Sequence, residues 1–423
     1  MTAAAATVQP NTLRGLRYLA GRLLPLSLWL TIFCGAFAFI EPSPYEYGFI
    51  ALTIIAALRG MAIPPVLIVP TLLLALFNFG GMASMAAIDS GMDQVKFIAV
   101  SGYLALTAII LALIIAEDPR RMAIVKSAYI AAALVAALAG IAGYFDIGGL
   151  YDLFTENARA RGTFKDPNVM GPFLILPTLF LAHDILRGNL RKVIVSAAIL
   201  APIMIAILLS FSRGAWGHTV VSFALFGWLL FSTSRSTGDR ARIVFTAIGA
   251  VFAAVALIAA MLSVPKVADL FQTRAHLVQY YDGGEMGRFG KQRYAIPDLI
   301  KHPNGYGAMK FRTKFGEDPH NVYVNAFASY GWLGGFTYAA FIAATLFAGA
   351  AAALRRTTFQ AYAIAVFSVF SVLALLGFII DTDHWRHFYL LCGATWGLFA
   401  ASMREMRSSA PETIRKNRLS AAS

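Results

Sequence analysis

Charged residues are scarce in this sequence. Asp, Glu, Lys and Arg make up 13% of its 423 residues, whereas 58% are hydrophobic and the mean hydropathy is +0.67. Soluble globular proteins carry about 25% charged residues. So few charges cannot cover a water-facing surface of this size, which excludes a soluble enzyme. Disorder is also excluded, because disordered chains combine low hydrophobicity with high net charge. A polytopic membrane protein remains.

The sequence has only two cysteines and no internal repeat. The two cysteines, Cys34 and Cys392, lie in or beside apolar runs and form no disulfide or metal-binding pattern. Many secondary transporters are built from repeated halves, so the lack of a repeat counts against that class.

Long apolar runs dominate what is present. A membrane-spanning helix needs about 20 mostly apolar residues. Arg14, Arg17 and Arg22 precede the first run, which is too long for a typical signal peptide and is predicted to be retained. We predict an all-α integral membrane protein that forms one polytopic domain over residues 1–423. Its twelve candidate spans are 23–40, 45–58, 61–80, 95–116, 122–145, 167–183, 193–211, 215–232, 243–263, 321–353, 359–380 and 388–403.

The net charge of +13 is explained by topology better than by nucleic-acid binding. With the N-terminus taken as cytoplasmic, 20 basic and 6 acidic residues lie in the inner segments, a net charge of +14. The remaining 15 basic and 16 acidic residues lie outside, a net charge of −1. We therefore predict that both termini are cytoplasmic and that the long segment 264–320, between spans nine and ten, is periplasmic. Apolar residues at helical spacing between Val264 and Val278 predict a helix on the outer membrane surface.

Some of the outer cations lie where topology gives no reason for them. Arg213 stands alone in SFSRGAWG, between two apolar runs. An arginine at such a position is costly unless its side chain reaches the interface or meets an anion. Both interpretations stay open from the residues alone. Arg159, Arg161 and Lys165 crowd a second outer loop, NARARGTFKDPN, which ends at Asn168.

Two further polar segments carry residues suited to chemistry. His320 and Asn321 lie where the long loop ends and the tenth span begins. The unperturbed pKa of histidine, about 6.5, leaves the neutral base available near pH 7. A polar interface residue with no catalytic task is the alternative. The segment DTDHWRHF, residues 381–388, has the residue types of a metal site, but we interpret it as a polar loop and predict no metal.

Four segments, taken in order, carry a resemblance to a known family. They are RGTFKDPNVMG (161–171), SFSRGAWG (210–217), GRFGKQRYAIPDLIKHPNGYGAMKF (287–311) and PHNVYVNAFASYGWLGG (319–335). Together they resemble the O-antigen ligase family of bacterial membrane glycosyltransferases. One departure is Tyr294, where the family often has Trp.

The resemblance implies a twelve-helix body like that of C-type glycosyltransferases, located in the bacterial inner membrane with a periplasmic active site. Such enzymes take a glycan from undecaprenyl pyrophosphate and pass it to an acceptor hydroxyl. The acceptor is lipid A–core for a ligase and another lipid-linked glycan for a polymerase. By position, the resemblance implies His320, Arg213 and Arg288 as catalytic residues, with Arg274 a rival to Arg288. It assigns Arg161, and with it Asn168, Asn321 and Arg274, to substrate binding.

The chemistry of these residue types agrees with that assignment. A pyrophosphate is a good leaving group whose developing charge guanidinium groups neutralise bidentately. His320 would act as the general base toward the attacking hydroxyl. We expect a metal-independent, inverting transferase that needs no cofactor, with membrane lipids and lipid-linked glycans as partners and no nucleic acid. An O-antigen or exopolysaccharide polymerase is the alternative. A lipid-linked glycan transporter is less favoured, because the ionisable residues lie at the ends of spans and line no path through them.

Overall fold

The part of the chain that the structure describes is mostly helical. The computed structural model describes residues 10–88, 90–274 and 287–408. Besides two single-turn 3-10 helices, Pro65–Leu67 and Pro119–Arg121, the elements are α1 (Pro10–Cys34), α2 (Pro44–Arg59), α3 (Ile68–Ala87), α4 (Met92–Glu117), α5 (Met122–Tyr144), α6 (Tyr151–Phe154), β1 (Thr155–Glu156), β2 (Arg159–Ala160), α7 (Pro167–Phe173), α8 (Ile175–Arg187), α9 (Leu190–Leu209), α10 (Arg213–Thr233), α11 (Thr237–Leu262), α12 (Pro265–Arg274), α13 (Arg288–Leu299), α14 (Phe311–Phe315), α15 (Val322–Leu354), α16 (Gln360–Leu376) and α17 (Arg386–Ser408).

Each of the twelve predicted runs coincides with a helix or, for the sixth, with the pair α7–α8. Within the described ranges, eight helical stretches are long and apolar enough to cross a membrane: α3, α4, α5, α7–α8, α9, α10, α11 and α15, some of them counted with a flanking 3-10 turn. The protein is therefore a multi-pass membrane protein. A count of twelve spans, which adds α1, α2, α16 and α17, stays a prediction.

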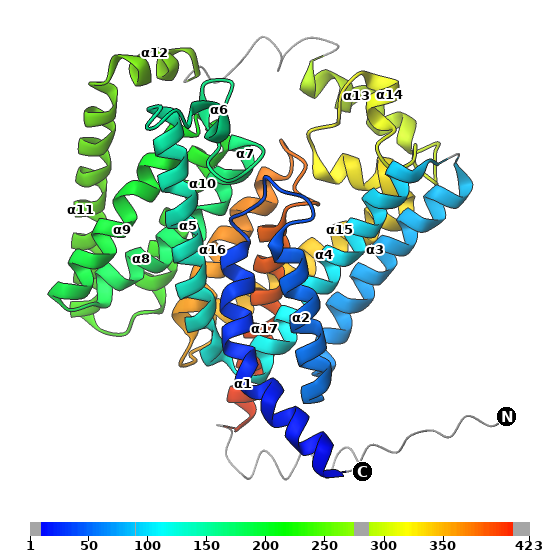
Figure 1. The fold of residues 1–423 in the computed structure, drawn as a ribbon, viewed down its shortest axis with the longest axis horizontal. Coiled ribbons are helices and arrows are strands. Elements are labelled where there is room, and N and C mark those ends of the chain that lie inside the picture. The colour runs from blue at the N-terminus through cyan, green and yellow to red at the C-terminus, as the bar shows by residue number, and fades with distance from the viewer. Residues whose placement is uncertain (1–9, 89, 275–286, 409–423) are drawn as a thin grey trace.

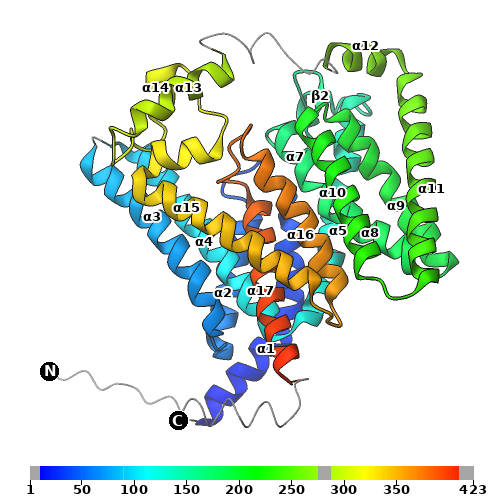
Figure 2. The same ribbon diagram turned by 180° about the vertical axis from the view of Figure 1, so that it is seen from behind.

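The helices α16 and α17 lie in the centre of the molecule, as both views show (Figures 1 and 2). Every residue of α17 from His387 to Ser402 is buried, and the helix packs against α4 and α15. Because neighbouring helices shield it from lipid, α17 tolerates polar side chains that a lipid-facing helix would not. The helix α11 is the opposite case, since Ile243 is its one buried residue.

Two of the predicted spans are interrupted. Between α7 and α8 the helix is broken at Leu174, flanked by Pro172 and Pro177, which lack the N–H that a continuous helix needs. In α15 the backbone leaves the helical region at Gly331, with φ 67° and ψ −172°. The turn that follows α13 packs into this second break: the N–H of Trp332 donates to the carbonyl oxygen of Pro303 at 2.8 Å.

The loop helices gather at one end of the molecule. In Figure 1, α6, α12, α13 and α14 lie at the end opposite the start of α1 and the end of α17. The predicted surface helix is present as α12, although Ala275 and Val278 lie outside the described residues. Its apolar side contacts the body of the protein: Val267 is buried and Phe271 stacks on Trp216 of α10 with ring centroids 5.5 Å apart. The described parts of the predicted loop 264–320 thus contain the helices α12, α13 and α14.

Candidate active site

His320 lies in a turn that is held by a carboxylate from another part of the chain. Its backbone has a φ of 47°, in the left-handed region, where a residue other than glycine needs support from its surroundings. The N–H groups of His320 and Asn321 donate to the two carboxylate oxygens of Asp381, both at 3.1 Å. Asp381 belongs to the loop between α16 and α17, so this pair of bonds fixes the turn to the centre of the bundle.

Asn321 begins α15 and connects it to α13. Its side-chain oxygen accepts hydrogen bonds from the N–H groups of Tyr323 and Val324, as an N-cap does, and its amide donates to Oε1 of Gln292 at 3.1 Å. Gln292 also donates to the carbonyl oxygen of Pro319 at 2.9 Å. Both Asn321 and Gln292 are buried. The side chain that was predicted to bind substrate is therefore engaged in holding the histidine turn.

Arg288 begins α13, one turn before Gln292. Its side chain lies outside the part of the chain that the structure describes. Gln292 forms hydrogen bonds with the residues before and after His320, Pro319 and Asn321. These bonds connect the first half of α13 to the histidine turn.

Arg213 is the first residue of α10, directly after a tight turn. Phe211 has a φ of 45°, and the hydroxyl of Ser212 accepts from the N–H of Ala215 at 3.3 Å, which caps the helix. Trp216 anchors the turn by donating from its ring N–H to the carbonyl oxygen of Ile207 at 3.1 Å. The half-buried Arg213 is thus carried on a rigid helix start.

The turn that bears His320 (the histidine turn) and the turn from Phe211 to Arg213 (the arginine turn) both pack against the C-terminal end of α16. A Cβ atom added at Gly214 would lie 2.9 Å from Cδ1 of Leu376. The N–H of Val322 donates to the carbonyl oxygen of Gly377 at 2.8 Å. Two segments that are more than a hundred residues apart in sequence therefore meet at neighbouring residues of one helix end.

A third predicted segment joins the arginine turn through Arg159. This buried guanidinium group donates from Nε to the carbonyl oxygen of Ser210 and from Nη2 to Oδ1 of Asn168, both at 2.8 Å. Arg161, the predicted ligand, instead donates to the carbonyl oxygens of Asp152 and Leu153 at 3.3 and 3.2 Å. The role of Arg159 could not be predicted from the sequence, because Arg159 and Arg161 are two residues apart in the same motif and no local pattern distinguishes them.

The two rival loop arginines lie on different sides of the site. Arg274 is the last residue of α12, one helical turn after Phe271, whose ring stacks on Trp216 of α10. It therefore belongs to the side of Arg213, whereas Arg288 belongs to the side of His320. Figure 1 shows the two helices well separated at the same end of the molecule.

The loop from Asp381 to His384 forms a polar cluster beneath the histidine turn. The His384 ring contacts Oδ2 of Asp383 at 3.1 Å and the carbonyl oxygen of Phe97 at 3.1 Å, and the Asn325 amide donates to Asp383 at 3.3 Å. Burial, reinforced by Asp383 and Asp318, raises the pKa of Asp381 to about 7. Burial alone would lower the pKa of His384, but the adjacent Asp383 carboxylate outweighs it and raises that pKa.

A metal centre is not evident in this cluster. Among residues 10–88, 90–274 and 287–408, no group of three or more His, Cys, Asp or Glu side chains is arranged to hold an ion. His387, the remaining candidate of the segment 381–388, is buried beside the rings of Trp385 and Phe173.

These features define a class of protein before any comparison: a multi-pass helical membrane protein with a polar site at one end of its bundle. The family model described as O-antigen ligase matches residues 196–339, about a third of the chain, and contains both the arginine and the histidine turn. This match supports membership of the O-antigen ligase family, whose members are glycosyltransferase-like enzymes acting on lipid-linked glycans and acceptors in the membrane. No curated protein matches the chain significantly.

Proposed function

We propose that this protein transfers a glycan from undecaprenyl pyrophosphate to a hydroxyl group of lipid A–core on the periplasmic face of the inner membrane, as an O-antigen ligase. The observation that carries the proposal is the meeting of two turns at the end of α16. One turn bears His320, a base, and the other bears Arg213, a cation. A base and an anion ligand near one point are what transfer from a pyrophosphate donor requires.

The reaction consists of one displacement. The acceptor hydroxyl oxygen attacks the anomeric carbon of the donor sugar, and the bond between that carbon and the pyrophosphate oxygen breaks. His320 takes the hydroxyl proton, while the electron pair leaves with undecaprenyl pyrophosphate. Attack from the side opposite the leaving group inverts the anomeric configuration. No metal ion is needed in this scheme, because guanidinium groups neutralise the diphosphate.

The cations divide the work by their position. Arg213 and Arg288 come from opposite sides of the site and bind the departing diphosphate between them. Arg274, on the side of Arg213, is the rival for this second role. Arg161 contacts the donor at the outer edge, where its guanidinium is held by backbone carbonyls of α6. Asn168 and Asn321 orient the turns and contribute to substrate binding through them.

Transfer of labelled glycan by the purified protein tests the proposal. We expect His320→Ala to reduce transfer at least about 100-fold, the usual contribution of a positioned base. Arg213→Ala and Arg288→Ala should reduce transfer similarly, because the diphosphate charge is no longer neutralised. Matched controls are Arg293→Ala on α13 and His183→Ala on α8, which should stay active. EDTA should leave the wild-type rate unchanged.

Several outcomes would contradict the proposal. Full activity of a folded His320→Ala protein would show that His320 is not the general base. EDTA inhibition that Mg²⁺ reverses would contradict the metal-independent mechanism. If Arg274→Ala is inactive and Arg288→Ala is active, the second cation comes from α12. A single repeat unit extended on a lipid-linked acceptor would identify a polymerase. Movement of the lipid-linked donor from one leaflet of a vesicle membrane to the other, without transfer of its glycan to an acceptor, would identify a transporter.

A further inference from the structure

Arg159 is a buried cation that the proposed reaction leaves without a role. Asn157 and Ala158 have φ values of 50° and 61° and form a two-residue turn between β1 and β2, in which Glu156 pairs with Arg159. This tight hairpin fixes the backbone of Arg159, and only 9% of the residue is exposed. A buried guanidinium group is costly unless its donors have acceptors, so the acceptors of this one indicate what it does.

Two hydrogen bonds connect the Arg159 guanidinium group to two other segments. Its Nε donates to the carbonyl oxygen of Ser210, directly before the arginine turn, and its Nη2 donates to Oδ1 of Asn168 on α7, both at 2.8 Å. The helices α7 and α10 are also in close contact, since a Cβ atom added at Gly171 would lie 2.4 Å from Cβ of Ala215. The planar fork of a guanidinium group can serve both acceptors at once, which the compact ammonium group of lysine cannot.

A chain of hydrogen bonds leads from Ser210 to Arg213. The Ser210 hydroxyl accepts from the N–H of Ser212 at 3.3 Å, and the Ser212 hydroxyl accepts from the N–H of Ala215 at 3.3 Å. Ser212 is thereby the N-cap of α10, and Arg213 is the first residue of that helix. Both serines are buried. Holding Ser210 therefore holds the backbone from which the Arg213 side chain extends.

We propose that Arg159 is a positioning residue for Arg213. By holding Ser210 and Asn168 together, it sets the direction from which the Arg213 guanidinium group meets the diphosphate. The inference rests on the proposed function, since it takes Arg213 as the ligand of the diphosphate. Two other roles compete with it: direct contact between Arg159 and the ligand, and a purely structural role in joining β2 to α7.

Binding of undecaprenyl pyrophosphate to the full-length protein in detergent tests this role. Arg159→Lys keeps the charge but loses the fork that spans both acceptors. We expect it to weaken binding about tenfold, the value of one hydrogen bond from a charged group. In the Arg213→Ala background the same substitution should change the affinity by less than about twofold, because no side chain is left to position. The polyprenyl tail keeps the residual binding measurable in that background.

Arg355→Lys is the matched control for a structural role. Arg355 follows α15, whereas the histidine turn precedes that helix, so the residue is remote from the site. It is half-buried and joins two helices by donating to the hydroxyl of Ser402 on α17 at 3.0 Å. We expect Arg355→Lys to leave the binding of undecaprenyl pyrophosphate unchanged, even where it lowers the melting temperature.

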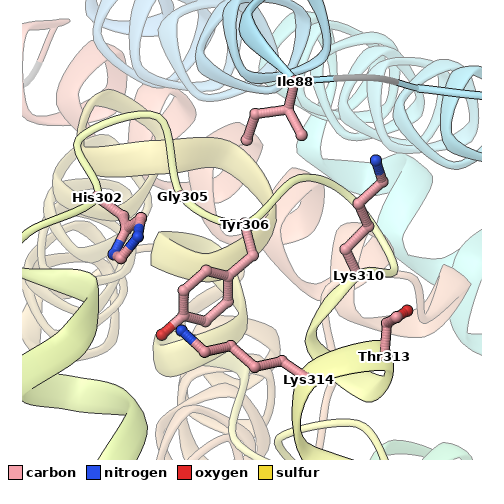
Figure 3. Close-up of a pocket in the computed structure, with 7 residues that line it drawn as sticks. All are labelled: Ile88, His302, Gly305, Tyr306, Lys310, Thr313 and Lys314. Atoms are coloured by element: carbon pink, nitrogen blue, oxygen red, sulfur yellow. The ribbon is translucent and has the colours of Figure 1, made fainter.

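Lys314→Gln is the control for the loss of a cation at the same end of the molecule. Lys314 lines a pocket of about 400 Å³ beside Tyr306, as Figure 3 shows. It pairs with Asp298 and has no printed contact with the arginine turn. Undecaprenyl pyrophosphate should bind this variant as it binds the wild type.

Asn168→Ala provides a second test that leaves Arg159 in place. It removes one of the two acceptors and should weaken binding at least about threefold, again only while Arg213 is present. This variant decides the matter if Arg159→Lys fails to fold, which its melting temperature shows.

The outcomes separate this role from the proposed transfer. Equal loss of affinity with and without Arg213 overturns the positioning role and indicates direct contact with the ligand. Wild-type affinity of a folded Arg159→Lys protein overturns it too, as does an equal loss in Arg355→Lys. If binding depends on both arginines together but no glycan is transferred, the positioning role stands and the proposed transfer fails.

Discussion

At the scale of single residues, the position of His320 depends on Asp381. One carboxylate accepts two consecutive N–H groups and holds a backbone that a histidine rarely adopts. Asparagine has a single side-chain acceptor oxygen, so Asp381→Asn leaves one of these N–H groups without its partner. We expect the variant to lose transfer at least about tenfold while it still folds, since an unpaired buried donor costs about 1–3 kcal/mol.

The raised pKa of Asp381 also predicts how the stability of the protein depends on pH. An acid whose pKa is raised on folding, here to about 7 by burial with help from Asp383 and Asp318, favours its protonated form in the folded state. Its contribution to stability is full below the ordinary pKa near 4 and is lost as the pH rises through 7.

The wild-type melting temperature should therefore fall between pH 5 and pH 8 by more than that of Asp381→Asn. The difference between the two proteins reports the titration of Asp381 together with its electrostatic effect on the pKa of His384, which the Asp381 carboxylate helps to raise. Differential scanning fluorimetry in detergent measures it. Parallel pH profiles of the two proteins would mean that Asp381 does not titrate in this range.

At the scale of elements, the break in α15 is what lets the long loop dock on the bundle. Gly331 has a φ of 67°, and a Cβ atom there would lie 2.7 Å from the carbonyl oxygen of Pro303. Gly331→Ala combines backbone strain with this clash, so we expect the melting temperature to fall by several degrees. Gly249→Ala in α11, where no atom lies within 4 Å of the added methyl, is the control and should not lower it. Equal melting temperatures for the two variants would show that the break is not required for docking.

The elements also mark how far the sequence could predict the structure. The apolar runs predicted every long helix, because burial in lipid requires long apolar segments. The break at Gly331 was not predictable: the segment YGWLGG contains three glycines, and the contacting Pro303 is 28 residues away. The same limit applies to the site. His320 could be predicted as a candidate base from its place in the chain, but Asp381 becomes the partner of its backbone only when α15 and α16 pack together.

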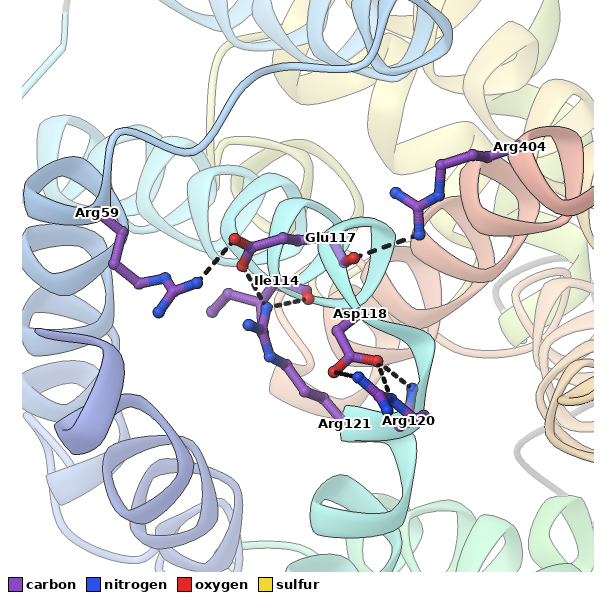
Figure 4. Close-up of polar contacts among 7 residues, drawn as sticks. All are labelled: Arg59, Ile114, Glu117, Asp118, Arg120, Arg121 and Arg404. Atoms are coloured by element: carbon purple, nitrogen blue, oxygen red, sulfur yellow. Dashed lines mark hydrogen bonds and ion pairs between the residues drawn. The ribbon is translucent and has the colours of Figure 1, made fainter. Parts of the chain in front are cut away.

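At the scale of the whole molecule, basic residues mark the end opposite the proposed site. Figure 4 shows the Glu117 carboxylate between Arg59 and Arg121, at 2.8 and 2.6 Å, and Arg404 donating to the Glu117 carbonyl oxygen at 3.2 Å. These contacts join α2, α4 and α17 at the end where α17 finishes. Under the positive-inside rule a basic end of this kind is expected to face the cytoplasm, as in the proposed orientation.

Labelling of introduced cysteines tests that orientation. The chain has two cysteines, of which Cys392 is buried and Cys34 is half-buried. The variant Cys34→Ala therefore has little accessible native thiol to react with the maleimide. On that background we expect Arg293→Cys, exposed on α13, to react with a membrane-impermeant maleimide in spheroplasts. Arg120→Cys, at a position whose side chain is 90% exposed, should react only after lysis. The reverse labelling pattern would show that the protein has the opposite orientation in the membrane, with the proposed site on the cytoplasmic side.

The central position of α17 has a consequence for how the protein is made. This helix is synthesised after α1 to α16, yet it fills the middle of the bundle, where sixteen consecutive residues lose all contact with lipid. A chain that ends before Arg386 lacks these buried residues, so we expect the helices that α17 packs against, α4 and α15, to be left without their central partner.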